Sequence, residues 1–411
     1  MRPGYKQTEA GVIPSDWKVV AFGTLASIER GKFSARPRND PKYYGGDFPF
    51  LQTGDVTRAG GKITSYSQTL NVDGVRVSRL FPRGTLFFTI AANIGDVGIS
   101  DFDAACPDSL VAISPKASSE KKWLLYELAS RKEEFELLAT PGAQLNINLE
   151  KLRPYLLPLP PLPEQSAIAT ALSDIDALLC SLDALIAKKS DIKKAAMQQF
   201  LTGKTRLPGF EDEWEVRLLG DVADVKTGPF GSSLHERDYV LDGTPIITVE
   251  HLGERGVDHV NLPMVSDADR KRLRAYSLEI GDIVFSRVGS IDRNALIRVA
   301  EVGWLFSGRL LRVRPRMDIV HPTFLSYQFH SERFRADVRN VAVGQTMASL
   351  NTKILNGLVV YLPTLAEQTA IAEVLSDVDA ELAALEARRD KTRLLKQGMM
   401  QELLTGKTRL V

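Results

Sequence analysis

The chain of 411 residues lacks several features that would assign it to a class at once. Its two cysteines, Cys106 and Cys180, are too few for a disulfide framework or a zinc knuckle. No apolar run approaches the ~18–20 residues that span a bilayer, and the polar N-terminus has no apolar signal segment. We therefore expect a cytoplasmic protein with no membrane partner.

An excess of charge of one sign is also missing. The sequence has 52 basic and 51 acidic residues, a formal net charge of +1, with 44% hydrophobic and 25% charged residues. This composition predicts an ordered chain of two or three domains and argues against a protein that coats nucleic acid through bulk charge. A DNA-binding protein whose basic residues lie on one face remains possible.

Catalytic motifs are absent as well. The five histidines form no HExxH motif, and the sequence has no GxSxG elbow, no GxGxxG fingerprint and no Asn/Asp-Pro-Pro-Tyr motif of amino-methyltransferases. The Gly-Lys-Thr at 203–205 and 406–408 lacks the first glycine of a phosphate-binding loop and is expected to close a helix, not to open one. We predict no catalytic residue, no metal site and no cofactor in this chain.

What is present is a tandem duplication. Residues 159–207 align without a gap to residues 362–410, with about 27 of 49 positions identical. The preceding regions match more weakly, with Trp17 equivalent to Trp214 and Gly31 to Gly228. The chain is therefore two copies of one unit, a divergent globular region followed by a nearly invariant segment.

The invariant segments have the apolar spacing of a coiled coil. Steps of three and four residues relate the seam positions, which are Ile168, Leu172, Ile175, Leu179 and Leu182 in the first copy and Ile371, Leu375, Val378, Leu382 and Leu385 in the second. Neither helix can bury its stripe alone, so we expect the two to pack as an antiparallel pair that forms a rigid spacer. Ordinary core helices are the alternative.

The globular regions combine short β-prone runs with helical patterns at 121–138 and 322–339. The predicted fold is mixed α/β, with two pseudo-symmetric domains separated by two long antiparallel coiled-coil helices. We place domain boundaries at 1–155, 156–207 for the central helical spacer, 208–357, and 358–411 for the C-terminal helical spacer.

This organisation resembles the specificity subunit of type I restriction-modification enzymes over essentially the whole chain. The N-terminal Gly4-Tyr5-Lys6-Gln7-Thr8-Glu9, the Pro160-Pro161-Leu162-Pro163-Glu164-Gln165 that starts the first helix and the duplicated Leu-Thr-Gly-Lys-Thr-Arg-Leu are similar to that family. Residues 281–287 and 344–346 resemble weaker marks of its target recognition domains. The equivalent Gly84-Thr85-Leu86-Phe87-Phe88-Thr89 of the first domain lacks the Asp and the Arg.

The resemblance implies a non-catalytic, DNA-binding subunit. Each target recognition domain would read one half of a bipartite double-stranded DNA site, and the helices would set the gap between the halves. Two methyltransferase subunits, which use S-adenosylmethionine to methylate adenine, would dock on the helices. Two restriction subunits, which use ATP and magnesium, could join them. The alternatives are a coiled-coil adaptor that reads no DNA and a fused restriction or methylation enzyme.

Candidate DNA contacts follow from their loop-like placement and their side-chain chemistry, since Lys and Arg neutralise phosphates while Arg, Asn and Gln read base edges. In the first domain they are Lys32, Arg36, Tyr43, Gln52, Arg58, Arg79, Asn93 and Gln144. In the second they are Lys226, Ser232, His235, Arg287, Arg293, Gln345 and Thr346. Neither half-site sequence nor the gap length follows from the residues alone.

Overall fold

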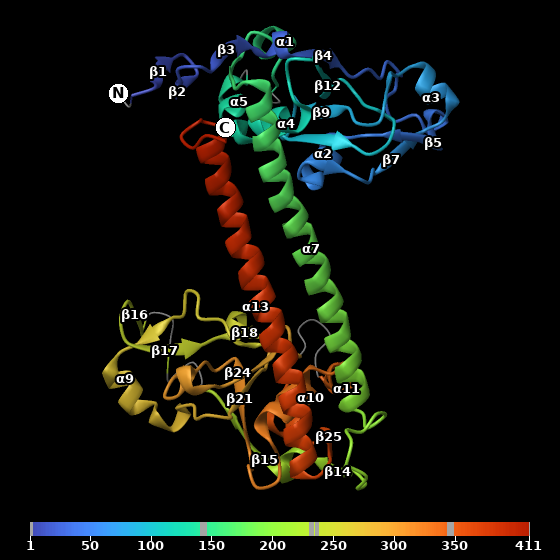
Figure 1. Ribbon diagram of the computed structural model, residues 1–411. Coiled ribbons are helices and arrows are strands. Elements are labelled where there is room, and N and C mark those ends of the chain that lie inside the picture. The colour runs from blue at the N-terminus through green and yellow to red at the C-terminus, as the bar shows by residue number, and fades with distance from the viewer. Residues whose placement is uncertain (1–2, 140–145, 230–233, 235–237, 343–348, 411) are drawn as a thin grey trace. The chain divides into compact units, whose positions relative to one another are not determined.

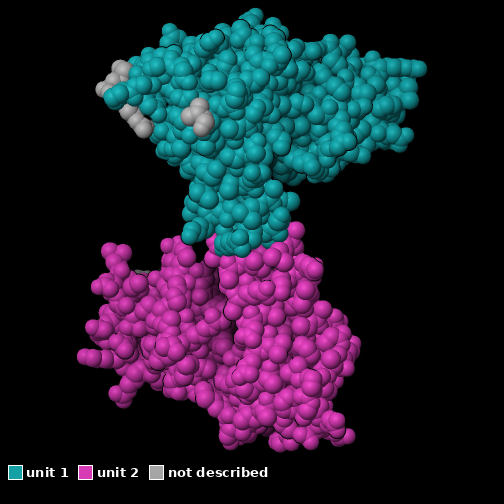
Figure 2. Space-filling view, viewed as in Figure 1, with its two compact units in different colours: residues 1–183, 388–411 teal, residues 184–387 magenta. Residues whose placement is uncertain are grey.

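The structure of the chain is a computed structural model, and it describes residues 3–139, 146–229, 234, 238–342 and 349–410 (Figure 1). The chain divides into two compact units, residues 1–183 with 388–411 and residues 184–387 (Figure 2). Two helices of 39 residues each, α7 (Leu162–Phe200) and α13 (Leu365–Leu403), contribute residues to both units. Each unit therefore holds one globular region and parts of both long helices.

Two main sheets form the globular part of the first unit. The five-stranded sheet has the order β4 (Ala26–Arg30), β12 (Leu110–Pro115), β9 (Leu86–Thr89), β10 (Val97–Ser100), β6 (Lys62–Ile63). The four-stranded sheet has the order β7 (Gln68–Leu70), β5 (Tyr44–Phe50), β11 (Ala104–Ala105), β8 (Leu80–Phe81). Strand β9 is buried at every position, as expected for the centre of a sheet covered on both faces.

Short helices and two small strand pairs complete this unit. The helices are α1 (Phe22–Leu25), η1 (Pro41–Tyr43), α2 (Thr53–Ala59), α3 (Val72–Arg76), α4 (Lys121–Ser130), α5 (Lys132–Leu138) and α6 (Leu149–Leu152). Strand β1 (Tyr5–Thr8) pairs with β2 (Gly11–Pro14), and β3 (Lys18–Ala21) pairs with β13 (Leu156–Leu159) just before α7. The helical pattern expected over 121–138 is thus two helices, α4 and α5.

The second unit repeats this plan. One sheet has the order β15 (Ala223–Thr227), β24 (Leu310–Pro315), β21 (Ile283–Ser286), β22 (Asn294–Leu296). The other has the order β16 (Tyr239–Val240), β20 (Met264–Val265), β17 (Thr244–Ile247), β23 (Leu305–Phe306). Strand β14 (Glu215–Leu218) pairs with β25 (Val359–Leu362) before α13, as β3 pairs with β13 before α7.

The second unit also contains a short hairpin of β18 (Leu252–Gly253) with β19 (Gly256–Val257). Its helices are α8 (Leu219–Val222), η3 (Val249–His251), α9 (Asp267–Arg272), η4 (Arg274–Tyr276), η5 (Val299–Glu301), α10 (Pro322–His330), α11 (Glu332–Val341) and α12 (Thr352–Asn356). Among the described residues, no helix combines the length and the apolar character needed to cross a membrane.

The long helices pack antiparallel in each unit. In the first, Ile168 and Leu172 near the start of α7 share a core cluster with Leu403 at the end of α13. In the second, Ile371 and Leu375 near the start of α13 share a cluster with residues 197, 200 and 201, where α7 ends. The predicted mixed α/β class, with a duplicated domain and two long antiparallel helices, is confirmed.

The predicted seam positions divide into two groups by burial. Ile168, Leu172, Ile371 and Leu375 are almost completely buried, because they also pack against the globular core of their own unit. Of the positions further along the helices, Leu182 and Leu382 are buried, whereas Ile175, Leu179, Val378 and Leu385 are half-buried. The start of each helix is therefore a part of a domain core as well as a helix–helix contact.

A glycine in the left-handed region follows each long helix, at Gly203 (φ +69°) and Gly406 (φ +68°). At Gly406 the backbone lies against Pro14, and an added Cβ would come within 2.5 Å of the proline ring. A side chain is therefore excluded there by both the backbone conformation and the space. This explains why the expected helix stop coincides with the repeated Leu-Thr-Gly-Lys-Thr-Arg-Leu.

Candidate nucleic-acid interface

The start of α7 is anchored by a buried carboxylate. Glu164 accepts from Arg409 at both oxygens, at 2.6 Å from Nε and 2.9 Å from Nη2, and it also accepts from Trp17 Nε1 at 2.9 Å. Arg409 also donates to Asp16, and this contact holds the pKa of the Asp16 carboxyl below its usual value. A bidentate arginine on a buried carboxylate fixes both position and orientation.

The start of α13 repeats this arrangement 203 residues later. Arg206 donates from Nε and Nη2 to the two oxygens of Glu367, both at 2.6 Å. Trp214 stacks near the guanidinium of Arg206, but its Nε1 is buried without a hydrogen-bond partner among the described residues. The repeated blocks are visible in the sequence, but the ion pair between them was not predicted. A glutamate and an arginine that both repeat at the same offset could have indicated this pair.

The glutamines of the duplicated Glu-Gln pairs join the helices to the globular regions. Gln165 accepts at 2.8 Å from the backbone N–H of Glu120, directly before α4. Gln368 accepts at 2.8 Å from the backbone N–H of His321, directly before α10. Both glutamines are almost completely buried. The Glu-Gln motif is therefore a structural joint and not a DNA-reading element.

A second contact ties each globular region to both helices. Tyr126 donates to Asp176 at 2.7 Å, and Lys396 pairs with the same carboxylate at 2.6 Å. In the second unit Tyr327 and Lys193 both donate to the carboxylate of Asp379, each at 2.7 Å. Burial raises the pKa of both phenols, which therefore remain donors. These clusters place the globular region of each unit on its helices.

Three of the predicted contacts of the first domain lie close together around α2. Arg58 on α2 pairs with Asp55, one turn earlier. Asn93, in the loop between β9 and β10, donates to Thr57 Oγ1 on α2 at 3.2 Å. Gln52, directly before α2, donates to Gln68 at 3.0 Å. Arg58 and Asn93 are exposed, so this corner presents polar groups to solvent.

The other described candidates of this domain lie around the loop that follows β4. Arg79 forms an ion pair at 2.5 Å with Glu29, and both side chains are about half exposed. The side chains of Lys32 and Arg36 are exposed, and Arg36 Nη1 donates to the carbonyl of Ala35. Tyr43, by contrast, packs edge-on against Phe33 within a small core cluster. Tyr43 therefore contributes to the core of this domain.

In the second domain the described candidates lie on or next to three strands of one sheet, β15, β21 and β22. Arg293, before β22, is exposed and donates to the carbonyls of Glu250 and Leu252. Arg287 follows β21 and donates from its backbone N–H to the carbonyl of Arg309. Lys226 donates to the carbonyl of Ala275 and lies over the Tyr276 ring. Gln144, Ser232, His235, Gln345 and Thr346 lie outside the described residues.

Each domain has a hydroxyl that shapes the loop after a buried strand. This loop carries Asn93 in the first domain and Arg293 in the second. Thr89 Oγ1 donates to the carbonyl of Asn93 and accepts from the N–H of Asp96. Ser286 Oγ donates to the carbonyl of Ser290 and accepts from the N–H of Arg293. Sequence reasoning missed Thr89 and Ser286, although both end a buried strand at equivalent positions.

The Asp that the first domain lacks has a structural role in the second. Asp282 is buried and accepts from Arg314 on β24 at 2.7 and 2.8 Å, as well as from the backbone N–H of Glu279. The first domain has Thr85 at this position, and its hydroxyl donates to the carbonyl of Pro82. Within the described part of the chain, no group of three or more His, Cys, Asp or Glu residues is arranged to hold a metal ion.

Comparison with known proteins gives a consistent result. The family model for the type I restriction modification DNA specificity domain matches residues 14–190 and 211–394. The MjaVIII specificity subunit of Methanocaldococcus jannaschii is 22% identical over 99% of this chain and 96% of that protein. The crystal structure of the type I restriction-modification S subunit from M. genitalium has a TM-score of 0.62 at 16% identity, covering 98% of this chain and 99% of that one. A structure from a type I system assembly study has a TM-score of 0.57 at 17% identity, covering 96% and 99%.

Proposed function

Because the chain belongs to the type I restriction modification DNA specificity family, we propose that its two globular regions each read one half of a bipartite DNA site. As a specificity subunit the chain is non-catalytic, and it selects the DNA on which partner subunits act. The duplication itself is the observation that supports recognition of two half-sites. Each globular region has its own helix, joined to it by the same carboxylate contacts.

The reading groups we propose are those that the sheets hold at exposed loop positions. Arg58 and Asn93 are exposed beside α2 in the first domain, and Arg293 is exposed before β22 in the second. Arginine and asparagine make bidentate contacts to base edges, while exposed lysine and arginine side chains neutralise phosphates. Lys32, Arg36 and Arg79 are exposed further along the first domain and suit phosphate contacts.

The long helices suit two further roles, as the spacer that sets the unread gap and as the docking surface for two methyltransferase subunits. Both helices are continuous over 39 residues. Equivalent apolar side chains on them are exposed, Ile192 by 45% and Leu395 by 54%. Leu162 and Leu365 form a second exposed pair with the same offset. Exposed apolar side chains repeated in both halves fit one kind of partner that binds twice.

The partners would supply the chemistry. A methyltransferase subunit would bring S-adenosylmethionine and methylate an adenine in each half-site. A restriction subunit, where one exists, would bring ATP and magnesium. We place the assembly in the cytoplasm, where DNA is accessible to it.

The test is a single-molecule methylation map of DNA from cells that express the chain with its methyltransferase partner, compared with cells that lack the chain. We expect a bipartite motif with one modified adenine per half, present only with the chain. A folded and bound partner that leaves no such motif would contradict the proposal and favour a coiled-coil adaptor. Alanine at Arg58 and Asn93 should alter only one half of the motif.

The spacer role is tested by inserting four residues into both long helices, which adds about 6 Å of rise to each. We expect a longer gap in the methylated motif with both half-site sequences unchanged. An unchanged gap in a folded variant would rule out the spacer role and leave half-site reading intact.

A further inference from the structure

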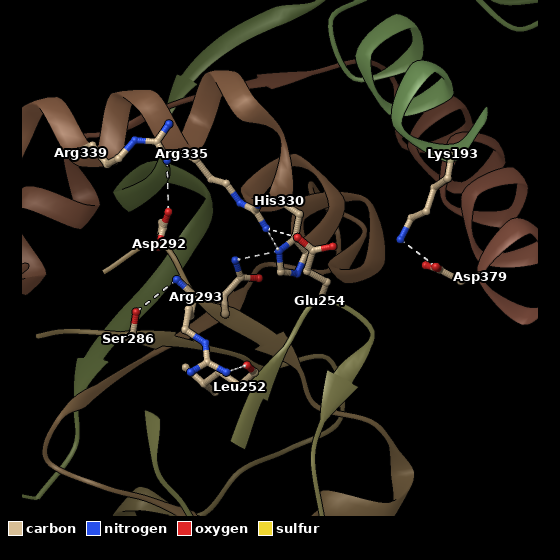
Figure 3. Close-up of polar contacts among 11 residues, drawn as sticks. Lys193, Leu252, Glu254, Ser286, Asp292, Arg293, His330, Arg335, Arg339 and Asp379 are labelled. Atoms are coloured by element: carbon tan, nitrogen blue, oxygen red, sulfur yellow. Dashed lines mark hydrogen bonds and ion pairs between the residues drawn. The ribbon is translucent and has the colours of Figure 1, made fainter. Parts of the chain in front are cut away.

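The second unit contains a polar cavity whose lining includes Arg293 and Leu252. It has a volume of about 320 Å³, roughly ten times the ~30 Å³ that one water molecule occupies. Its walls come from the β18–β19 hairpin (Gly253 and Glu254), the start of β22 (Asn294) with Arg293 directly before it, and the α10–α11 corner. We call it the His330 pocket, after the α10 residue that lines it (Figure 3).

The hydrogen bonds of His330 fix where its proton lies. Its Nδ1 faces two donors, Arg335 Nη2 at 3.3 Å and Asn294 Nδ2 at 3.5 Å, so Nδ1 is the acceptor nitrogen. The proton is then on Nε2, which is buried and has no partner among the described residues. Burial lowers the pKa of His330 to about 4, which keeps the ring neutral at pH 7. A buried N–H donor is therefore left unsatisfied in the wall of the cavity.

The arginines around the cavity provide a second open donor and one guanidinium that is in no ion pair with a described carboxylate. Arg335 Nε is also buried without a partner among the described residues. Glu254 pairs with Arg335, and Asp292 pairs with Arg339. The guanidinium of Arg293 donates to the carbonyls of Glu250 and Leu252 and forms no ion pair with a described carboxylate (Figure 3). Arg339 also pairs with Glu332, so Arg293 is the one of these three arginines that pairs with no described carboxylate.

We propose that the His330 pocket binds a phosphate oxyanion, through the two open N–H donors of His330 and Arg335 and the unpaired charge of Arg293. Two N–H donors and one guanidinium without a carboxylate partner match a group with several acceptor oxygens and a negative charge. The remaining unpaired acceptor, Asn294 Oδ1, takes a water or the hydroxyl of a protonated phosphate. The bound group could come from two sources, the phosphodiester backbone of DNA or inorganic phosphate, because both have this chemistry. Binding of the DNA backbone rests on the proposed function.

The first unit has different residues at two positions of this pocket. Tyr126 and Tyr327 are equivalent positions of the two halves, and Ala129 and His330 each lie three residues after them. The first unit therefore has the exposed Ala129 where the second has His330. At the position equivalent to Arg293 it has Asp96, which pairs with Lys132 at 2.6 Å. The first half therefore lacks the His330 and Arg293 side chains of the proposed site and serves as an internal reference.

Two variants test the pocket. Arg293→Gln removes the unpaired charge and keeps an N–H₂ group for the carbonyl of Leu252, and His330→Phe removes the open donor while filling the volume. The matched control is Arg217→Gln on β14, which removes an exposed arginine of the same unit that pairs with Glu215. Binding of the assembled methyltransferase complex to a duplex with its mapped motif is measured over a salt series.

For the DNA source, we expect the slope of log K against log salt to decrease by about one in both variants and not in the control. For the second source, sodium phosphate is compared with sodium chloride at equal ionic strength, with hydrogen exchange of residues 252–254 and 330–335 as the readout. Protection by phosphate that His330→Phe abolishes, with an unchanged salt slope, assigns the site to free phosphate.

An unchanged salt slope together with no protection by phosphate overturns the proposal. If His330→Phe does not fold, Arg293→Gln decides both measurements, because its exposed side chain is replaced without a change in the core. If the native complex binds no motif at all, half-site reading fails, while the phosphate measurement still decides whether the pocket takes an oxyanion.

Discussion

The two halves of the chain agree where the helices begin and differ where the domains face their surroundings. Tyr126 and Tyr327 make the same contact to equivalent aspartates on α7 and α13. The next helical position differs, because the first half has Glu127 in a buried ion pair with Arg131, whereas the second has the neutral Gln328. Duplication has kept the contacts that hold a domain on its helix and has changed the remaining polar interior.

This difference separates two kinds of constraint. The helix contacts recur because both halves need the same joint between a sheet domain and a long helix. The interior and loop residues diverge because each half has its own surroundings to recognise. Each half can therefore serve as the control for the other in the same sample, and the three predictions below use this property.

The largest effect is expected from the equivalent core leucines of the two long helices. Leu172 and Leu375 are completely buried, each in the core cluster of its own unit. Replacing either by Ala should destabilise its own unit by about 2–5 kcal/mol, because transfer energy is lost and a cavity remains. Hydrogen exchange on the full chain, resolved by peptide, measures the effect in each unit separately.

The exposed Leu394→Ala is the control for this pair and should change stability by less than about 0.5 kcal/mol. Losses of similar size in the matching units would show that the two joints are energetically equivalent. A loss confined to one of the two variants would break the comparison, since one helix start would then contribute little to its core.

The next effect concerns pH and only the second half. Burial lowers the pKa of His330 to about 4 from 6.5, although Glu254 and Asp379 act to raise it while Arg335 and Lys193 act to lower it. Between pH 6.5 and 4 the unfolded chain then binds more protons than the folded chain. The stability from neutral His330 is present above pH 6.5 and is lost as the pH falls to 4, by about 3 kcal/mol.

Hydrogen exchange of the second unit at pH 7 and pH 4.5, corrected for intrinsic exchange, measures this loss. His330→Phe should abolish the part of the pH dependence that this ring contributes. The first unit, with Ala129 at the equivalent position, should show no matching component. An identical acid response in the native chain and in His330→Phe would mean that this ring titrates at its ordinary pKa in the folded protein.

Sequence patterns predicted the fold because its main features are periodic or repeated. The heptad spacing located both long helices, and the constant offset of 203 related the Glu164 and Glu367 joints before any contact was known. The contacts themselves were less accessible, because Arg409 meets Glu164 across 245 residues of sequence. A long-range ion pair has no periodicity, so only its repetition in Arg206 and Glu367 could have indicated it.

The candidate contacts were harder still to predict. Arg58, Asn93 and Arg293 were chosen as DNA contacts for their loop-like placement and side-chain type, and all three are exposed, although Arg58 lies on α2. Tyr43 has the same polar neighbourhood in sequence, yet it packs on Phe33. The tautomer of His330 depends on Asn294 and Arg335, which come from different elements. Such a site depends on tertiary proximity, which local composition does not encode.

The smallest predicted effect comes from the one difference between the two helix joints. Glu164 accepts from Trp17 Nε1 at 2.9 Å in addition to Arg409, whereas Trp214 Nε1 makes no such bond, and Arg206 is the one side-chain donor to Glu367 among the described residues. A buried carboxylate that loses its arginine but keeps another donor is less destabilised than one that loses every side-chain donor.

Arg206→Met should therefore destabilise its unit more than Arg409→Met destabilises the other, by about 1.5–3 kcal/mol, the contribution of a hydrogen bond to a charged group. The additional contact of Arg409 with the exposed Asp16 changes this little, because exposed ion pairs contribute weakly. Peptide-resolved hydrogen exchange measures both variants. Adding Trp17→Phe to Arg409→Met should remove the difference, since Glu164 would then lack both donors. A difference that persists in the double variant would show that the tryptophan bond does not account for it.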